Sequence, residues 1–100
     1  MLTLILDENN KIYWRQGISI PKLETIESTN ESIHKLLVTK NKEIDEMLVL
    51  VKSTSKSKYK NLVDVLDELE IAKIRYCFDD LTKDELQLIE IVKNRPLTSK

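Results

Sequence analysis

Glycine, proline, cysteine and histidine are all scarce in this sequence, and their scarcity argues against several kinds of functional site. Among 100 residues there are one glycine, two prolines, one cysteine and one histidine. A single glycine argues against the glycine-rich loops that hold phosphate groups. One cysteine cannot form a disulfide within the chain, and one cysteine with one histidine do not supply the ligand set of a zinc site.

Long apolar runs and a strong net charge are missing as well. No apolar run approaches the ~18 residues needed to cross a bilayer, and the start of the chain, MLTLILDENN, does not have the pattern of a signal peptide. The net charge is −1 and the isoelectric point is about 5.9, so the chain as a whole is not attracted to nucleic acid or to an anionic membrane. With 41% hydrophobic and 33% charged residues, residues 1–100 are expected to fold as one globular domain.

Two short segments at the start of the chain predict a β-hairpin. Leu2–Asp7 and Lys11–Arg15 are rich in β-branched and aromatic residues, and they flank Glu8–Asn10, which favours a turn. The next segment, Gln16–Glu27, contains the only glycine and one proline and has no steady period. It is therefore predicted to be a loop or a partly extended crossing segment.

A helix and a strand are predicted next. Ser28 and Glu31 have the spacing of a capping box, which marks the start of a helix. The apolar stripe of this helix consists of Ile33, Leu36 and Leu37. Met47–Lys52 is a continuous apolar run, which is typical of a strand buried on both faces.

The middle of the chain predicts a strand–helix–strand unit. Ser57 is the expected N-cap of a helix that extends to Leu69, and Lys73–Phe78 alternates as a half-buried strand does. The two strands are expected to be parallel, with a right-handed crossover. The predicted centre of the core is formed by Leu62, Leu66 and Leu69 of the helix with Val49, Val51 and Ile74 of the strands.

The last segment is predicted to be a helix that contributes to a homodimer. Thr82 and Glu85 form a capping-box pattern, and Pro96 would end the helix. Short alternating runs resemble a strand, but their phase slips between Leu88 and Ile89, which favours the helix. On this helix Leu86 and Ile89 are expected to project one way, and the predicted dimer residues the opposite way. The predicted dimer residues are Leu88, Ile91 and Val92.

The residues that could support catalysis each have a more ordinary interpretation. His34 lies at the flank of a helical stripe and is interpreted as a surface histidine, although its sequence position alone does not exclude a Ser-His-Asp or Cys-His pair. Cys77 lies in mid-strand and is interpreted as a small packed side chain, with Arg75 on the same face as the only feature that favours a reactive thiolate. We therefore expect a protein that is not an enzyme and has no cofactor.

Charged clusters are interpreted in the same way. Two clusters of acidic residues have a spacing that would suit a divalent cation. They are Asp64, Asp67 and Glu68 on one helical face, and Asp79 and Asp80 at a strand end. The first group interleaves with Lys60, which favours a solvated face. A basic cluster is formed by Lys52, Lys56, Lys58 and Lys60, but only Tyr59 accompanies it. In a nearly neutral chain this predicts no nucleic-acid partner.

Several segments, in their order, resemble a known family. They are the hairpin LTLILDENNKIYW, a capped helix after a loop containing GI, the strand MLVLVK, the loop and helix SKYKNLVDVLDELEIAKI, and the strand RYCFDD. In this order they resemble the periplasmic domain of ExbD/TolR-type biopolymer transport proteins, in particular the form found in Bacteroidetes. The similarity covers roughly residues 2–92, and its most specific block is SKYKNLVDVLDELEIAKIRY.

The resemblance implies a role in energy transduction across the cell envelope. ExbD-like proteins have a cytoplasmic tail, a transmembrane helix with a proton-carrying aspartate, and a periplasmic domain. With ExbB and TonB they pass the energy of the proton gradient to outer-membrane transporters. TolR does the corresponding task with TolQ and TolA, and it binds peptidoglycan. The tail and the membrane helix have no counterpart in this chain, so the aspartate is not assigned to any of its residues.

By this resemblance, the chain is expected to be a periplasmic domain on the inner membrane that dimerises and binds a TonB-like protein. A TolR-like, peptidoglycan-associated domain is one alternative, and an unrelated small α+β interaction domain is another. The family's C-terminus tends to continue as a strand, whereas TKDELQLIEIV is predicted to be a helix here. Because of this difference, an exchange of C-terminal strands, as the family resemblance would suggest, is not expected at this end of the chain.

The expected architecture is an α+β fold with a mixed sheet of about four strands in the order ββαβαβ, followed by a C-terminal helix. The two main helices each have one apolar stripe, so they are expected on one face of the sheet, with the other face left largely to solvent or a partner. A partner is expected to pair with an exposed strand edge, either Ile74–Phe78 or the hairpin strand that contains Trp14. The candidate partner-binding residues are Trp14, Ile74, Tyr76 and Phe78.

Overall fold

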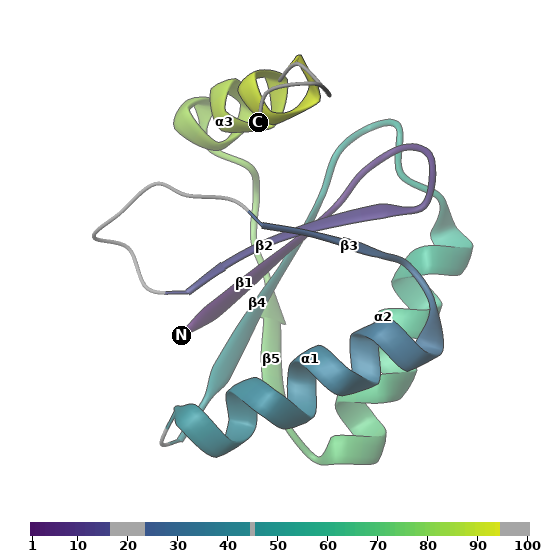
Figure 1. Cartoon of the computed structure of the whole chain (residues 1–100), viewed down its shortest axis with the longest axis vertical. Helices are drawn as coiled ribbons and strands as arrows, with labels where there is room; N and C mark the ends of the chain where they lie inside the picture. Colours follow the sequence, from purple (N-terminus) through teal and green to yellow (C-terminus); the bar gives the residue numbers. More distant parts are fainter. Residues whose placement is uncertain (17–23, 45, 95–100) are drawn as a thin grey trace, which may run out of the picture.

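The computed structural model of the chain describes residues 1–16, 24–44 and 46–94, which form one mixed β-sheet and three helices (Figure 1). The strands are β1 (Leu2–Leu6), β2 (Lys11–Gln16), β3 (Glu24–Glu27), β4 (Leu48–Ser53) and β5 (Arg75–Phe78), and the helices are α1 (Asn30–Glu43), α2 (Tyr59–Ala72) and α3 (Lys83–Lys93). The order across the sheet is β3-β2-β1-β4-β5, with β1, β4 and β5 parallel to one another. The predicted α+β class is confirmed.

The predicted hairpin is formed by β1 and β2, and the geometry of its turn explains why asparagine occupies both central positions. The Lys11 amide donates to the Glu8 carbonyl over 3.3 Å, and Asn9 and Asn10 between them have φ values of 61° and 56°. Positive φ at both central residues is characteristic of a type I′ turn, whose twist matches that of the flanking strands. Asparagine tolerates this backbone region better than most residues do.

Strand β3 was not predicted from the sequence. It pairs with β2 inside the segment that was expected to be a loop or a partly extended crossing segment, and residues 17–23 of that segment lie outside the described residues. Ile26 is the only apolar residue of β3 and lies opposite Ile12, while Lys11 forms an ion pair with Glu27. One apolar residue gives no alternating signal, so this strand was not predicted. The sheet of the described residues therefore has five strands where about four were predicted.

Helices α1 and α2 lie on one face of the sheet, as predicted (Figure 1). Between them and the sheet lies the main core, to which the predicted α1 stripe of Ile33, Leu36 and Leu37 contributes. Helix α1 is capped by Thr29, whose hydroxyl accepts the Ser32 amide over 3.1 Å. The predicted capping residue Ser28 is instead buried one position earlier, because its amide donates to the Asn10 carbonyl of the hairpin turn.

The buried face of α2 is rotated relative to the predicted face. Its buried residues are Asn61, Val65, Glu68 and Leu69. Leu69 is fully buried as expected, and Val49, Val51 and Ile74 of the predicted core are buried too, but Leu62 and Leu66 are only partly buried. The rotation is tolerated because the buried polar groups have partners: Asn61 bonds to the hairpin turn, and Glu68 faces α1.

The ends of α2 also differ from the prediction. Its N-cap is Lys58, without a side-chain cap, because the Ser57 hydroxyl donates to the Thr54 carbonyl over 2.9 Å. At its C-terminus Lys73 adopts the left-handed conformation, with φ 59° and ψ 41°. This residue turns the chain directly into β5, which pairs parallel to β4 as the predicted strand–helix–strand unit requires.

Helix α3 lies on the opposite face of the sheet from α1 and α2 (Figure 1). Ile89 of this helix packs on Ile5 of β1 and Tyr13 of β2, which are register partners in the sheet. The predicted capping box is present, with the Thr82 hydroxyl accepting the Glu85 amide and the Glu85 carboxylate accepting the Thr82 amide. The expectation of a largely open second face is therefore wrong, because α3 covers part of it. No helix of the described residues is long and apolar enough to span a membrane.

Candidate functional site

The exposed edge at β5 is the first candidate site. Among the described strands β5 has β4 as its one neighbour, so its other side is an edge of the sheet. Arg75, Cys77 and Phe78 are exposed and Tyr76 is partly buried. An edge strand presents amide and carbonyl groups that an extended polypeptide can pair with. The predicted partner-binding strand is thus an edge in the structure.

The backbone groups that face this edge belong to Tyr76 and Phe78. The Asp79 amide donates to the Val51 carbonyl of β4 over 3.2 Å. Successive residues of a strand direct their amides and carbonyls to opposite sides, so Cys77 also faces β4. Tyr76 and Phe78 then direct their polar backbone groups away from β4. Their two rings form an edge-to-face pair with centroids 5.9 Å apart.

The other predicted binding residues are placed differently. Ile74 is buried in the main core just before β5 begins and is not available to a partner. Trp14 lies on β2, which is paired on both sides, so the strand of Trp14 is not an edge. Its ring packs on the core under Lys40, whose ammonium lies 4.8 Å from the ring centroid. The second edge of the described sheet is β3, which the sequence did not reveal.

A buried ion cluster lies where α3 meets the sheet. The Lys52 ammonium of β4 lies 2.7 and 2.8 Å from the two carboxylate oxygens of Glu85, and Arg15 of β2 donates to Glu85 over 2.9 Å. The side chain of Glu85 is fully buried and that of Lys52 is 5% exposed. Burial favours the neutral form of Glu85, but Lys52, the Thr82 amide and Arg15 outweigh it and hold its pKa below the ordinary value.

A second ion cluster lies at the other end of α3. The Lys93 ammonium lies 2.8 Å from carboxylate oxygens of both Asp7 and Glu8, and the Thr54 hydroxyl donates to Asp7 over 2.6 Å. Asp7 is buried, which opposes its ionisation, yet Lys93 and Thr54 hold its pKa below the ordinary value. The pKa of Lys93 is raised by the same two carboxylates. Neither cluster was predicted, because residues from distant segments meet in each.

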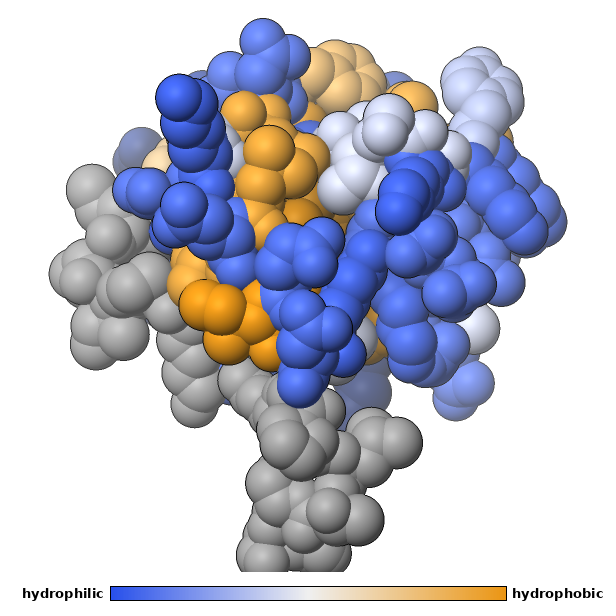
Figure 2. Space-filling view, turned by 90° about the horizontal axis from the view of Figure 1, so that it is seen from above, coloured by the Kyte–Doolittle hydropathy of each residue, from blue (hydrophilic) through white to orange (hydrophobic). Residues whose placement is uncertain are grey.

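Two of the three predicted dimer residues lie on the side of α3 that faces the sheet. Leu88 and Val92 pack beside Ile89 against the sheet, so the predicted division of α3 into two opposite stripes is wrong. The buried stripe follows the helical spacing of Glu85, Leu88, Ile89 and Val92. Of the three predicted residues only Ile91 is exposed, by 61%, and on its other flank α3 exposes Leu86. Seen from the side of α3, hydrophobic residues form a strip flanked by hydrophilic ones (Figure 2).

The candidate catalytic residues are scattered in the described structure. His34 is more than half exposed, as predicted, and its Nδ1 lies 3.2 Å from Glu68 of α2. Cys77 is exposed rather than packed. It lies on the edge strand β5, and the cluster under α3 includes no residue of that strand. The predicted carboxylate face is divided, since Asp64 pairs with Lys60 while Glu68 is buried against α1. No group of three or more His, Cys, Asp or Glu side chains in the described ranges could hold a metal ion.

The predicted basic cluster is divided as well. Lys52 is buried in the ion cluster under α3, and Lys60 pairs with Asp64 on the outer side of α2. Lys56 and Lys58 remain exposed on the loop before α2. These lysines do not form one continuous surface.

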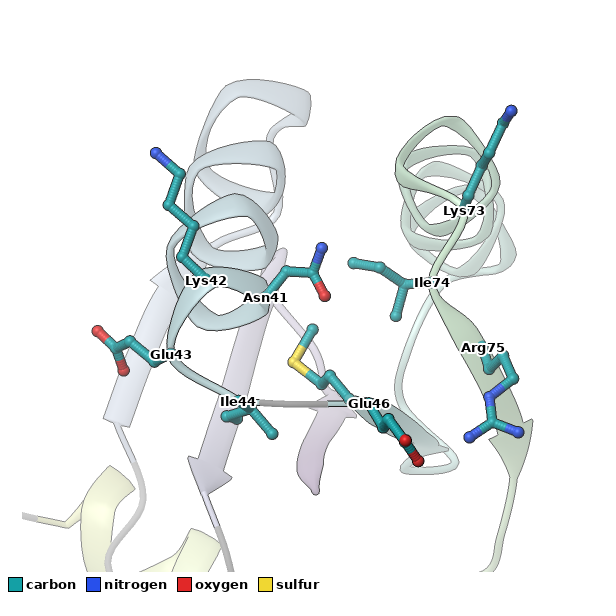
Figure 3. Close-up of a pocket in the computed structure, with 9 residues that line it drawn as sticks. Asn41, Lys42, Glu43, Ile44, Glu46, Lys73, Ile74 and Arg75 are labelled. Atoms are coloured by element: carbon teal, nitrogen blue, oxygen red, sulfur yellow. The ribbon is translucent and has the colours of Figure 1, made fainter.

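A hollow of about 480 Å³ lies where α1 and α2 end and β5 begins. Asn41 and Ile74 point toward each other across it, whereas Lys42 and Lys73 point away (Figure 3). Six of the nine residues that line it are polar or charged, and the apolar ones are Ile44, Met47 and Ile74. An active site requires polar groups that converge on a reacting atom, and this hollow does not bring its charged groups together.

The chain was compared with protein-family models, with curated proteins and with solved structures, and none of them matches it. The candidate function therefore rests on the geometry of the β5 edge and on the residues of the α2–β5 unit.

Proposed function

We propose that this chain is a polypeptide-binding domain without catalytic activity, namely the periplasmic domain of an ExbD-type subunit in a TonB–ExbB–ExbD complex. In this proposal the domain dimerises and binds a TonB-like protein on the periplasmic side of the inner membrane. The observation that carries the proposal is the edge of β5, where Tyr76 and Phe78 direct their backbone groups away from the sheet. Residues 57–76, which make the most specific block of the resemblance, form helix α2 and lead into that edge.

Strand addition at a sheet edge fits such a task. A segment of the partner would pair its backbone with the edge, and its side chains would alternate between the two faces of the sheet. The rigid frame needed for this is supplied by β4 and α2, which hold β5 through parallel pairing and through the left-handed turn at Lys73. Backbone pairing gives affinity without any catalytic group, which agrees with the dispersed positions of His34 and Cys77.

The proposal is tested by titrating the isotope-labelled domain with the periplasmic segment of a TonB-like protein. We expect shifts of backbone amides at an edge of the sheet, on β5 or on β3. A Phe78→Pro variant removes the one outward amide at Phe78, and a Phe78→Ala variant serves as its side-chain control. If β5 is the binding edge, the proline variant should weaken binding by at least roughly ten-fold relative to the alanine variant.

Two results would contradict the proposal. One is a set of shifts confined to the surfaces of α1, α2 and α3 while both edges stay unchanged. The other is the absence of any ExbB-like or TonB-like protein that copurifies with the full-length gene product. A peptidoglycan pull-down with the same material distinguishes the TolR-like alternative, because it gives a positive result only if the domain binds the cell wall.

A further inference from the structure

A groove of about 350 Å³ lies between helix α1 and the edge of the sheet at β3. Its surface is mostly apolar and is formed by Trp14 of β2, Ile26 of β3 and Leu36 of α1. Trp14 and Ile26 pack on the main core but stay partly exposed, so the groove is an uncovered margin of that core. A mostly apolar cleft of this size is typical of a binding site.

Two lysines of α1 make the rim of the groove positive. Lys35 and Lys40 line it, and no acidic residue of the described chain does. Lys40 lies over the Trp14 ring and also meets Glu43. Lys35 forms no ion pair or hydrogen bond with another described residue. An apolar lining beside a cation of this kind suits a ligand that combines an apolar group with a carboxylate.

The backbone of β3 has two residues whose polar groups point away from β2. The Ser28 amide donates to the Asn10 carbonyl over 2.8 Å, and these two residues continue the β2–β3 register. Hydrogen-bonded pairs alternate along an antiparallel ladder, so Ile26 bonds to β2, whereas Thr25 and Glu27 direct their amides and carbonyls outward. An extended segment can therefore form backbone bonds with these two residues.

The groove lies where a side chain of such a segment would point. A residue opposite Ile26 in an added antiparallel strand belongs to a non-hydrogen-bonded pair, in which side chains are closest. Its side chain projects to the same face of the sheet as Ile26, which is the face covered by α1, and it enters the groove there. A residue two positions away projects to the same face, where the lysines form the rim.

We propose that the β3 edge and this groove bind an extended polypeptide segment that has a bulky apolar residue and an acidic residue two positions from it. The segment adds a strand to the sheet through Thr25 and Glu27. Its apolar side chain packs on Trp14, and its carboxylate meets Lys35. The site lies at the opposite end of the described sheet from β5. The inference goes beyond the proposed function, because it assigns a second polypeptide site that does not depend on what binds β5.

The groove is tested by fluorescence, because Trp14 is the only tryptophan of the chain. The probe is a blocked peptide of nine residues. It consists of threonines with a leucine at the centre and an aspartate two positions later. Its addition should shift the Trp14 emission to shorter wavelength, with half-saturation below about 1 mM. The same peptide with alanine in place of leucine should bind at least roughly ten-fold more weakly, because it buries less apolar surface.

The charge preference is tested by reversing one charge on each side. Lys35→Glu should weaken binding of the aspartate peptide about five-fold. The matched control is Lys42→Glu, an exposed lysine of the same helix outside the groove, which should change binding by less than about two-fold. A peptide with lysine in place of aspartate should bind the Lys35→Glu variant within about two-fold of the original pair.

Backbone pairing is tested at Thr25. Because its amide points away from β2, Thr25→Pro removes an outward donor and leaves the bonds between β2 and β3 intact. Thr25→Ala is the side-chain control. The proline variant should bind the peptide at least about five-fold more weakly than the alanine variant. In the isotope-labelled domain the amides of β3 should shift with the peptide while those of β5 stay unchanged.

Four results would overturn the inference. They are a Trp14 emission that does not change at about 5 mM peptide, a Lys35→Glu variant that still prefers the aspartate peptide, equal binding by the proline and alanine variants, and tighter binding of decanoate than of the peptide. The last would assign the groove to a small amphiphilic anion. None of these measurements uses a TonB-like protein. A domain that fails them and still shifts its β5 amides with the TonB-like segment keeps the proposed function, and failure of that titration alone leaves the β3 site in place.

Discussion

The ammonium of Lys52 and the carboxylate of Glu85 are in contact at 2.7 Å, and both side chains are buried. Lys52 comes from β4 and Glu85 from the first turn of α3, so their contact attaches α3 to the second face of the sheet. Burying two charges is costly, and it is offset only when each charge keeps good partners. Here Arg15 and the Thr82 amide complete the shell around Glu85.

Removing one partner of this pair should therefore lower the stability of the fold strongly. Glu85→Ala leaves the Lys52 ammonium buried without a counter-charge, and we expect it to lower the free energy of unfolding by about 3–5 kcal/mol. Glu90→Ala, at an exposed position of the same helix, should change it by less than about 0.5 kcal/mol. Urea unfolding measures both. A Glu85→Ala variant that unfolds like the Glu90 control would show that the pair contributes nothing.

The two buried carboxylates predict a loss of stability in acid. The pKa values of Asp7 and Glu85 in the folded chain lie below their ordinary values of 3.8 and 4.5. Since the unfolded chain then binds more protons in this range, unfolding becomes easier as the pH falls. We expect the stabilisation to be complete above about pH 5 and to be lost progressively as the pH falls below about 4.

Denaturant titrations between pH 7 and pH 3 check this slope. An Asp7→Asn/Glu85→Gln variant should be less stable at pH 7 and should depend less on pH than wild type. If wild type and variant keep the same difference in unfolding free energy at every pH, these carboxylates are not the groups responsible.

The left-handed residue at the end of α2 predicts a stabilising substitution. Lys73 has φ 59°, a conformation that costs most residues roughly 1–2 kcal/mol and costs glycine little. Lys73→Gly should therefore raise the free energy of unfolding by about 0.5–1 kcal/mol, after the entropy that glycine gains in the unfolded chain is subtracted. Lys73→Ala is the control for loss of the lysine side chain and should give no gain. The prediction fails if both variants shift the melting temperature equally.

The rotation of α2 predicts different costs for two leucines. Leu69→Ala removes a fully buried side chain and should cost about 2–5 kcal/mol through lost burial and the cavity left behind. Leu66→Ala, at a partly buried position, should cost about half as much or less. Chemical denaturation of the two variants orders them directly, and a larger loss for Leu66 would mean that α2 packs with the face first predicted from the sequence.

Periodicity and local chemistry were enough to predict much of the fold. The hairpin follows from two β-rich segments around Asn9 and Asn10, the α3 capping box follows from the spacing of Thr82 and Glu85, and the parallel β4–β5 pair follows from the helix between them. Each of these features is decided by residues close together in the chain. Strand β5 was predicted in the same way, because its alternation is local, whereas its place at the edge depends on the order of the whole sheet.

Features that depend on distant residues could not be predicted. The sequence shows Glu85 as a capping residue and Lys52 as one of several lysines, and only the packing of α3 on the sheet brings them together. The face of α2 was placed wrongly because Glu68 looks like a solvated residue until His34 and the rest of α1 lie beside it. β3 was missed because one isoleucine among polar residues gives no pattern.

The charges at the two ends of α3 also decide which way the helix lies. Glu85, near its start, meets two cations of the sheet, and Lys93, near its end, meets two carboxylates. The same helix reversed on the same apolar residues would bring Glu85 against carboxylates and Lys93 against cations, each without a counter-charge. Apolar packing alone accepts either direction, so these ion pairs give the docked helix its polarity, and they hold the C-terminal end of α3 against the hairpin turn at Asp7 and Glu8.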